Sequence, residues 1–349
     1  MELPMWPPRT ATKGTKITDV TKSSKPVVPR LHLFEIDDQP WFPALLRRYV
    51  QMGLLHLWTT KVPFIQQCTP ASLVAEVLQS ELGSDVSKHT FVDFCSGAGG
   101  PTPEIERVLN EKLKDQQSTT PAPKVRFNRN GSEDDESYAQ VVKRLKAGTS
   151  SHTKTPYAHF VLTDIHPNIS SWTKAVKKSS HITFVPEPVD ASNVSPNLLN
   201  GHVSKDKKVF RLFNLAFHHF DDNLAGKVLE DTIETSDGFG IFELQSRDLP
   251  SLAACVLFGF VAWIFTLFLY WWNPPMLLFG FCIPIVPFVL FFDGVISALR
   301  TRTFSEVDQL FHTCSKNGSD WELRSGTETF LWPVGRMTWI IGTKMGSEA

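Results

Sequence analysis

The sequence predicts an α/β fold: a doubly wound, mostly parallel seven-stranded sheet, preceded by a helical segment and interrupted after its fifth strand by a membrane hairpin. Short apolar runs alternate with helix-like stretches over most of the chain, which is typical of a parallel sheet flanked by helices. A glycine-rich turn follows the first of these runs. The 44 residues from Leu249 to Phe292 contain no Asp, Glu, Lys or Arg, which predicts a membrane segment within the fold.

The composition narrows the functional classes. The 349 residues include 35 Lys and Arg against 36 Asp and Glu, and this near-neutral balance argues against nucleic-acid binding. Hydrophobic residues make up 42% of the chain, which excludes a wholly disordered protein and allows a large core. The five cysteines are widely spaced and form no CxxC pair, so the sequence predicts neither a disulfide framework nor a metal site.

The chain before the first strand divides into two parts. Residues 1–30 are rich in Pro, Thr, Lys and Ser and lack an apolar core of signal-peptide length, so a disordered cytosolic tail is expected. Residues 31–87 carry many aromatic and aliphatic side chains punctuated by Pro40, Pro43 and Pro63. We expect this part to form a helical cap of three short helices.

Seven apolar runs are expected to form the strands. They are His89–Phe94, Ala158–Leu162, Ile182–Val185, Val209–Ala216, Gly240–Leu244, Trp321–Ser325 and Met337–Thr343. Helices are expected at Pro103–Leu113, Leu224–Thr235 and Ser305–Cys314. The sheet domain thus spans residues 88–248 and resumes at 297–349, with residues 249–296 as the hairpin.

A polar stretch interrupts this domain. Residues 114–156 include an acidic run, Glu133 to Glu136, and are expected to form a disordered insertion with a helix near Tyr138–Leu145. The insertion carries no residue that we assign to catalysis.

The first strand ends at an acidic residue and a turn of small residues. Asp93 is followed by Phe94 and then by Cys95-Ser96-Gly97-Ala98-Gly99-Gly100, and a helix comes next. Such a turn lets backbone approach a nucleotide-like ligand closely. The spacing departs from the GxGxxG pattern of dinucleotide-binding proteins and resembles motif I of the class I S-adenosylmethionine-dependent methyltransferases, with Cys95 in the first glycine position.

This resemblance implies a Rossmann-like fold and S-adenosyl-L-methionine as cofactor. It also implies that Asp93, Cys95, Gly97 and Gly99 contribute to the cofactor site. The region that resembles the family covers residues 88–110, 157–248 and 304–343.

Three later segments resemble further motifs of the family in the family's order. Asp164 resembles the acidic residue after the second strand, which in this family accepts hydrogen bonds from both ribose hydroxyls. Asp190 and Ala191 resemble the third motif, which contacts the adenine. The segment from Asn214 to Phe220 resembles the fourth motif, at the edge where the methyl acceptor is held, and it adds Asn214 to the cofactor-binding residues.

Each of these residues also has a purely structural interpretation. Glycine turns serve dehydrogenases and plain packing, Asp164 could cap a helix, and Asp190 could close an Asx-turn. His218 and His219 could be solvated loop residues. Four matching segments in the family's order favour the cofactor site over four separate coincidences.

The chemistry that the resemblance implies is in-line transfer of a methyl group from a sulfonium to a nucleophile. The protein then positions the reactants and, for an oxygen acceptor, removes a proton. His218 and His219 after the fourth strand, and Glu243 at the end of the fifth, are the candidate catalytic residues. The fourth motif lacks the Asn-Pro-Pro-Tyr of amine-methylating relatives, so the sequence does not identify the atom that accepts the methyl group.

The segment before the first strand carries a second resemblance. Phe34–Pro43, together with Asp93–Pro101, resembles fungal membrane-associated methyltransferase-like proteins. This resemblance suggests an origin and no substrate. The cap is expected either to cover the cofactor cleft or to cover one edge of the sheet.

The uncharged stretch predicts two membrane helices. Residues 250–272 supply about 22 apolar residues, roughly 33 Å of helix and enough to cross the hydrocarbon core. Asn273-Pro274-Pro275 breaks this helix, and the shorter Met276–Phe292 contains Pro284 and Pro287, so it is expected to be kinked or re-entrant. A buried hairpin in a soluble protein is the alternative.

The sides of the membrane follow from the flanking residues. Strands before and after the hairpin belong to one sheet, so the segment has to return to the side from which it leaves. Arg247, Arg300 and Arg302 flank the stretch, and the positive-inside rule places both ends and the catalytic domain in the cytosol, with the endoplasmic reticulum as a suitable membrane.

These observations predict S-adenosylmethionine-dependent methyl transfer to a small lipophilic acceptor at the cytosolic membrane surface. The expected partners are the lipid bilayer and the lipophilic small molecule, without nucleic acid. The alternative is a methyltransferase-like membrane scaffold that has lost catalysis, for which Cys95 in a glycine position and the acidic insertion leave room.

Overall fold

The structure is a computed structural model. It describes residues 26–61, 66, 68–118, 157–195, 201–204, 206–314 and 320–345. Residues 1–25 of the expected tail lie outside the described residues. The same holds for 119–156 of the expected insertion, including the helix expected near Tyr138–Leu145.

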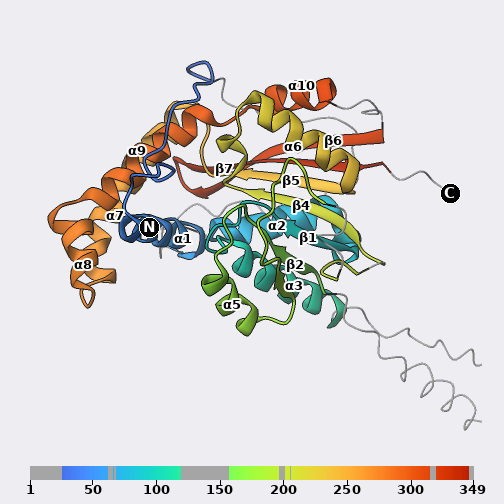
Figure 1. The fold of residues 1–349 in the computed structure, drawn as a ribbon, viewed down its shortest axis with the longest axis horizontal. Coiled ribbons are helices and arrows are strands. Elements are labelled where there is room, and N and C mark those ends of the chain that lie inside the picture. The colour runs from blue at the N-terminus through green and yellow to red at the C-terminus, as the bar shows by residue number, and fades with distance from the viewer. Residues whose placement is uncertain are drawn as a thin grey trace, which may run out of the picture.

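A seven-stranded sheet lies at the centre of the molecule, in the strand order β3-β2-β1-β4-β5-β7-β6 (Figure 1). Strands β1 to β5 are parallel, and β7 runs antiparallel to both β5 and β6. The strands are β1 His89–Asp93, β2 His159–Leu162, β3 Ile182–Phe184, β4 Lys208–Asn214, β5 Gly238–Glu243, β6 Trp321–Leu331 and β7 Gly335–Lys344. All seven expected strands are therefore present, and β6 is longer than expected because it pairs with β7 along its length.

Helices cover both faces of the sheet, because the side chains of each strand alternate between two cores. One core joins the sheet to α2 (Pro70–Leu82), α3 (Thr102–Ser118) and α5 (Ile169–Lys178). The other joins it to α6 (Asp222–Thr235) and α10 (Phe304–Cys314). The sequence analysis did not anticipate α5, a short helix whose first turn is capped by the Asn168 side chain.

The segment expected to form a cap contains the helices α1 (Ala44–Thr59) and α2, and a 3-10 turn η1 (Gly83–Lys88). Helix α2 packs on the sheet, and α1 reaches the same core through Trp58 near its carboxyl end. Leu46, Tyr49 and Val50 of α1 share a separate apolar cluster with Val289 and Leu290. Helix α2 therefore belongs to the face of the sheet, and α1 connects the sheet core to the apolar hairpin.

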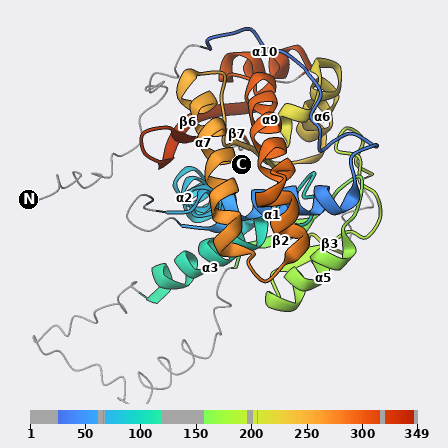
Figure 2. The same ribbon diagram turned by 90° about the vertical axis from the view of Figure 1, so that its left-hand side faces the viewer.

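The hairpin consists of α7 (Leu249–Leu269), α8 (Pro274–Leu277), a π-helical turn η3 (Leu278–Cys282) and α9 (Ile285–Arg300). Helices α7 and α9 lie against each other and project from one edge of the sheet (Figures 1 and 2). Among the described residues, only α7 is a single helix long and apolar enough to cross a membrane. The second arm is bent by 58° between η3 and α9, so it is one span only if the broken pair is counted together.

The three arginines that flank the hairpin are not free to act as membrane-facing charges. Arg247 pairs with Glu306 and Arg302 with Asp222, while Arg300 pairs with Glu35 and Asp38. All three arginine side chains are buried. Protein carboxylates therefore engage their charges, and the membrane orientation inferred from these arginines stays a prediction.

Arg211 on β4 is the largest buried cation of the sheet. It donates hydrogen bonds to Asp231, Thr232 and Thr235 of α6 and to the backbone oxygen of Ala191, 3.3 Å away. The guanidinium carbon also lies 4.7 Å from the centre of the Phe94 ring. One side chain thus ties the loop after β3 to the second core.

We expect Arg211→Met to destabilise the protein by about 3–5 kcal/mol, since it leaves Asp231 without its buried partner. Arg107→Met is the matched control, because Arg107 pairs with Glu104 and Glu111 on the exposed surface of α3 and should cost less than about 1 kcal/mol. Urea unfolding followed by circular dichroism measures both. Equal losses in the two variants would contradict the structural role of Arg211.

Candidate functional site

The carboxyl ends of the parallel strands meet at one edge of the sheet, and the expected site residues gather there. Asp93 ends β1, Asn214 ends β4 and Glu243 ends β5. Asp164 and Asp190 lie in the loops after β2 and β3. Ligands of doubly wound sheets bind at this edge, at the point where the strand order reverses, which here lies between β1 and β4.

The backbone beside this reversal adopts left-handed conformations. Cys95 has a φ of 59° and Leu215 has a φ of 54°, and they are the only non-glycine residues with positive φ in the described part of the chain. They follow β1 and β4 closely and so flank the switch point on both sides. Such conformations are strained for residues with a Cβ and concentrate at functional sites.

The glycine turn presents open backbone at this point. Gly97 has a φ of 51°, and its Cβ position has no neighbouring atom within 4 Å. Its carbonyl oxygen accepts a hydrogen bond from Trp172 Nε1 at 3.0 Å, and its N–H donates to Asp164 Oδ2 at 2.8 Å. Hydrogen bonds therefore hold the N–H and the carbonyl group of Gly97, while the space beside its Cα, where a Cβ would stand, is open.

Asp164 connects the turn to the loop after β2. Its Oδ2 accepts from Gly97 N–H, and its Oδ1 accepts from His166 N–H at 2.7 Å. Each carboxylate oxygen has a second lone pair, so both oxygens can still accept from a ligand hydroxyl. Asp164 thus holds the turn in place and can still accept hydrogen bonds from the ribose hydroxyls of a cofactor, as expected from the sequence.

Asp190 and Ala191 continue the same edge. Asp190 is exposed, and its Oδ1 accepts from the backbone N–H and the hydroxyl of Ser192 at 2.8 and 2.7 Å. This is the Asx-turn that the sequence offered as an alternative. Ala191 is buried and its carbonyl oxygen is held by Arg211, so the loop presents Asp190 from a fixed backbone.

Asp93 forms a buried triangle with Thr102 and Asn214. Thr102 Oγ1 donates to Asp93 Oδ2 at 2.5 Å, and Asn214 Nδ2 donates to Asp93 Oδ1 at 3.1 Å. Burial raises the pKa of Asp93 to about 7, although both hydrogen bonds favour the charged form. The Asn214 Oδ1 atom is buried without a hydrogen-bond partner among the described residues.

His218 and Glu243 form a buried pair on the other side of Asn214. The His218 backbone N–H donates to Glu243 Oε1 at 3.1 Å, and His218 Nδ1 lies 2.8 Å from Glu243 Oε2. A carboxylate on Nδ1 fixes the orientation and tautomer of the ring. The Nε2 atom of His218 then faces Glu35, whose Oε1 is 3.7 Å away.

His219 belongs to the same cluster but is only half-buried. Its Nδ1 lies 3.1 Å from Asp38 Oδ2 and 3.8 Å from Glu35 Oε2. Burial lowers the pKa of His219, but the hydrogen bond to Asp38 and the charges of Glu35 and Asp38 outweigh it and raise the pKa to about 9. His219 therefore carries a proton at neutral pH when the cluster is arranged in this way.

Glu35, Asp38 and Arg300 are the members of this cluster that the sequence analysis did not assign to the site. Arg300 Nη1 lies 3.1 Å from Glu35 Oε1, and Ser297 Oγ donates to the same oxygen at 2.9 Å. The signal available in the sequence was the acidic run Glu35-Ile36-Asp37-Asp38 in an otherwise aromatic segment. Its partners lie in the turn Phe217–His219 after β4 and on α9, and they could not be read from spacing.

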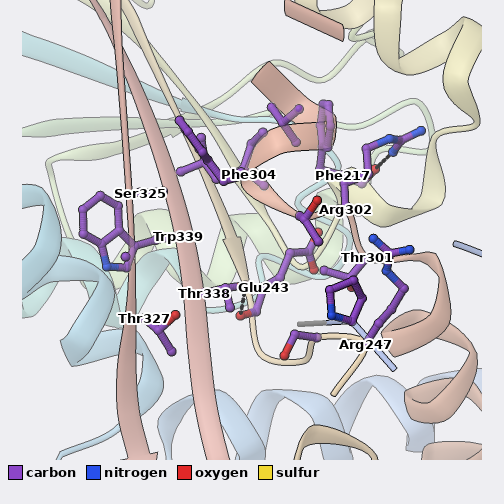
Figure 3. A pocket seen from close by; sticks show the side chains of 17 residues that line it. Phe217, Glu243, Arg247, Thr301, Arg302, Phe304, Ser325, Thr327, Thr338 and Trp339 are labelled. Carbon is purple, nitrogen blue, oxygen red and sulfur yellow. Dashed lines mark hydrogen bonds between the residues drawn. The ribbon is translucent and has the colours of Figure 1, made fainter. Parts of the chain in front are cut away.

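A cavity of about 90 Å³ lies beside Glu243, on the side of β5 and β7 (Figure 3). Its walls include Arg247, Arg302, Thr338 and Trp339, and Figure 3 shows them around Glu243. The cavity has room for several water molecules. None of its lining residues comes from the glycine turn, so this cavity adjoins the histidine cluster and is separate from the switch point.

Comparisons with known proteins were made for the whole chain. No protein-family model and no curated protein matches it. Among solved structures, the methyltransferase domain of bacterial CtHen1 matches at 9% identity over 78% of this chain and 97% of its own, with a TM-score of 0.36.

Two further structures match over similar lengths. The O-methyltransferase TomG from Streptomyces achromogenes, solved in complex with SAM, matches at 9% identity over 85% of this chain and 89% of its own, with a TM-score of 0.33. A protein from Rhodobacter sphaeroides, described as a Zn-dependent alcohol dehydrogenase, matches at 10% identity over 85% and 98%, with a TM-score of 0.37. At these values no function transfers to the chain, and the geometry of the site has to carry the assignment.

The buried carboxyl group of Asp93 makes stability depend on pH. Its folded pKa is raised above the unfolded value of 3.8, so the folded state holds the proton more tightly and stability falls as pH rises from about 4 to about 7. We expect Asp93→Asn to remove this fall and to raise the free energy of unfolding by roughly 1–3 kcal/mol at pH 8.

Thermal melts at pH 5 and pH 8 measure this difference. Asp308→Asn on the surface of α10 is the control and should change stability by less than about 0.5 kcal/mol at either pH. An Asp93→Asn variant that is less stable than wild type at pH 8 would contradict the proposed cost of the buried charge.

Proposed function

We propose that the chain is an S-adenosylmethionine-dependent methyltransferase that acts on a small lipophilic acceptor at a membrane surface. The observation that carries this proposal is the hydrogen bond between Gly97 N–H and Asp164 Oδ2. It joins the first and second segments of the family resemblance, 67 residues apart, around open backbone at the switch point between β1 and β4.

The residues at this edge fit the cofactor from one end to the other. Asp164 offers two oxygens to the ribose hydroxyls, and Asp190 with the backbone of Ala191 lies beside it for the adenine. The unpartnered Asn214 Oδ1 is a buried acceptor suited to the ammonium group of the methionine end. The clear space above Gly97 supplies the close approach that the cofactor needs.

The cofactor, when bound, supplies an electrophilic methyl group on a sulfonium. The chain then has to hold an acceptor in line with that methyl group and exclude water. His218, His219 and Glu243 lie next to Asn214 in the chain or in space, and we place the acceptor against this cluster. The cluster activates the acceptor, whether oxygen or another nucleophile.

The apolar hairpin accounts for the membrane location. Its 21-residue helix α7 is about 31 Å long and carries exposed apolar side chains along its length, including Val256, Phe260, Ile264 and Phe268. Trp271 and Trp272 at the tip are exposed, as expected at a membrane interface. The hairpin begins after β5 and returns through α9 to the same edge of the sheet. The sheet domain therefore stays on one side of the bilayer, and we propose that this is the cytosolic side.

Contacts near the end of α9 limit how far the second arm of the hairpin can enter the bilayer. The last turns of α9 are buried in the protein, where Asp293 accepts from Ile36 N–H and Asp37 N–H. We therefore propose that α7 crosses or enters the bilayer and that α8, η3 and the first half of α9 return as a broken span. This arrangement places the acceptor site beside the lipid, where an apolar acceptor is concentrated.

A pair of glycine variants tests the cofactor site. Gly97→Ala should weaken S-adenosylmethionine binding at least tenfold, because the new methyl group fills the clear space above the turn. Gly83→Ala is the matched control, since Gly83 has a φ of 55° and an equally open Cβ position but lies after α2, away from the site. Each should cost about 1–3 kcal/mol of stability through backbone strain.

Isothermal titration of S-adenosylmethionine into the detergent-purified full chain measures the affinities, with Asp164→Asn as a second weakened variant. Equal affinity in wild type, Gly97→Ala and Asp164→Asn would place the ligand elsewhere. Transfer of a radiolabelled methyl group to a lipid extract then tests catalysis. Tight binding without any methylated product would support the catalytically inactive membrane scaffold instead.

Membrane association is tested on the exposed face of α7. Phe260→Lys places a charge in the middle of this helix and should reduce flotation of the protein with phosphatidylcholine vesicles severalfold. Leu224→Lys, at an exposed position on α6, should leave flotation unchanged. Loss of flotation in both variants, or in neither, would argue against α7 as the membrane anchor.

A further inference from the structure

The cluster around His218 and His219 has the composition and spacing of a metal site. Ligand atoms from Glu35, His218 and His219 all lie within 4.8 Å of one another. Glu35 Oε1 is 3.7 Å from His218 Nε2, and Glu35 Oε2 is 3.8 Å from His219 Nδ1. Two ligands bound at about 2.1 Å to one cation stand roughly 3.0–3.4 Å apart. A ligand pair at the 4.8 Å limit would therefore have to draw together by about 1.4 Å to complete the site.

The surroundings of each ligand match those of bound metal ligands. The other ring nitrogen of His218 is held by Glu243 at 2.8 Å, the carboxylate–histidine arrangement that orients metal-bound imidazoles. Ser297 Oγ donates to Glu35 Oε1 and holds that carboxylate in place. Asp38 Oδ2, 3.1 Å from His219 Nδ1, is placed to become a fourth ligand.

The charges leave room for a divalent cation. Three carboxylates belong to the cluster: those of Glu35 and Asp38 pair with Arg300, and that of Glu243 pairs with His218. Arg300 Nη1 lies 3.1 Å from Glu35 Oε1 and 3.5 Å from both Asp38 Oδ2 and His219 Nδ1, so the guanidinium would have to move aside when a cation binds. With His219 protonated, Arg300 and His219 together leave one of the three carboxylate charges uncompensated in a largely buried cluster, and burying unpaired charge is costly. A bound divalent cation would take the place of the His219 proton.

We propose that Glu35, His218 and His219 bind a divalent transition-metal cation such as Mn²⁺, Co²⁺ or Zn²⁺. Two imidazoles and one carboxylate on one side of a cation leave other coordination positions for a further ligand. An acceptor hydroxyl bound there would be more acidic than in water, which points to an oxygen acceptor. That role rests on the proposed methyl transfer, whereas the binding of the cation does not.

The test uses the full chain in detergent, freed of metal by chelation and titrated with Co²⁺ and Zn²⁺ alone. We expect one cation per chain by calorimetry and the visible absorption bands of four- or five-coordinate Co²⁺. His218→Ala and Glu35→Gln should each weaken binding by about tenfold or more. His312→Ala, on the exposed surface of α10, is the matched control and should bind as wild type does.

Folding of each variant is checked by its thermal melt, and His219→Asn, which keeps a polar side chain, serves if Glu35→Gln does not fold. Absence of stoichiometric binding by folded wild type, or binding unchanged in both His218→Ala and His219→Asn, would overturn the proposal and leave Arg300 as the cation of the cluster. Binding of Co²⁺ without binding of S-adenosylmethionine would retain the metal site and reject the methyltransferase.

Discussion

The antiparallel pairing of β7 with β5 is the constraint on which the rest of the structure depends. The pairing runs from Gly238 opposite Thr343 to Glu243 opposite Thr338, and glycines permit the close contact. A Cβ on Gly342 would stand 2.3 Å from the Phe239 ring. The chain leaves β5 at the carboxyl edge of the sheet and has to come back to pair β7 with β5. The apolar hairpin, α7 to α9, therefore begins and ends near this edge.

This return explains why the hairpin lies against the candidate site. Helix α9 ends at Arg300, whose side chain reaches the acidic segment Glu35–Asp38 and the His218–His219 turn. Helix α1 then packs across α9, and Gly53 allows the helices to approach closely at Leu290. Three segments that are distant in sequence thus converge on one buried cluster.

The flanking arginines show how one residue pattern can serve two physical purposes. Arginines beside an apolar stretch indicate membrane orientation when their charges face solvent and lipid headgroups. Here the same side chains are buried in ion pairs at the foot of the hairpin. Of these three pairs, only Arg300–Glu35 is buried on both sides. Such a pair fixes geometry more than it adds stability, because desolvation offsets much of the attraction.

The sequence by itself determined the order of the strands in the chain, the glycine turn and the uncharged hairpin. These are local patterns: an apolar run, a small-residue turn and a lack of charge each reveal themselves within a few residues. The site residues at the ends of β1, β2, β3, β4 and β5 could be found for the same reason, since parallel strands bring their carboxyl ends to one edge.

Only the tertiary structure decided which side chains meet across that edge. The partners of His218 come from residues 35 and 243, and the cluster is completed by Arg300 and Asp38. Such contacts arise from packing between distant elements and leave no spacing pattern in the sequence. The bend in the second arm is the contrasting case: Pro284 and Pro287 predicted a kink from local sequence, and the arm is bent by 58° between η3 and α9.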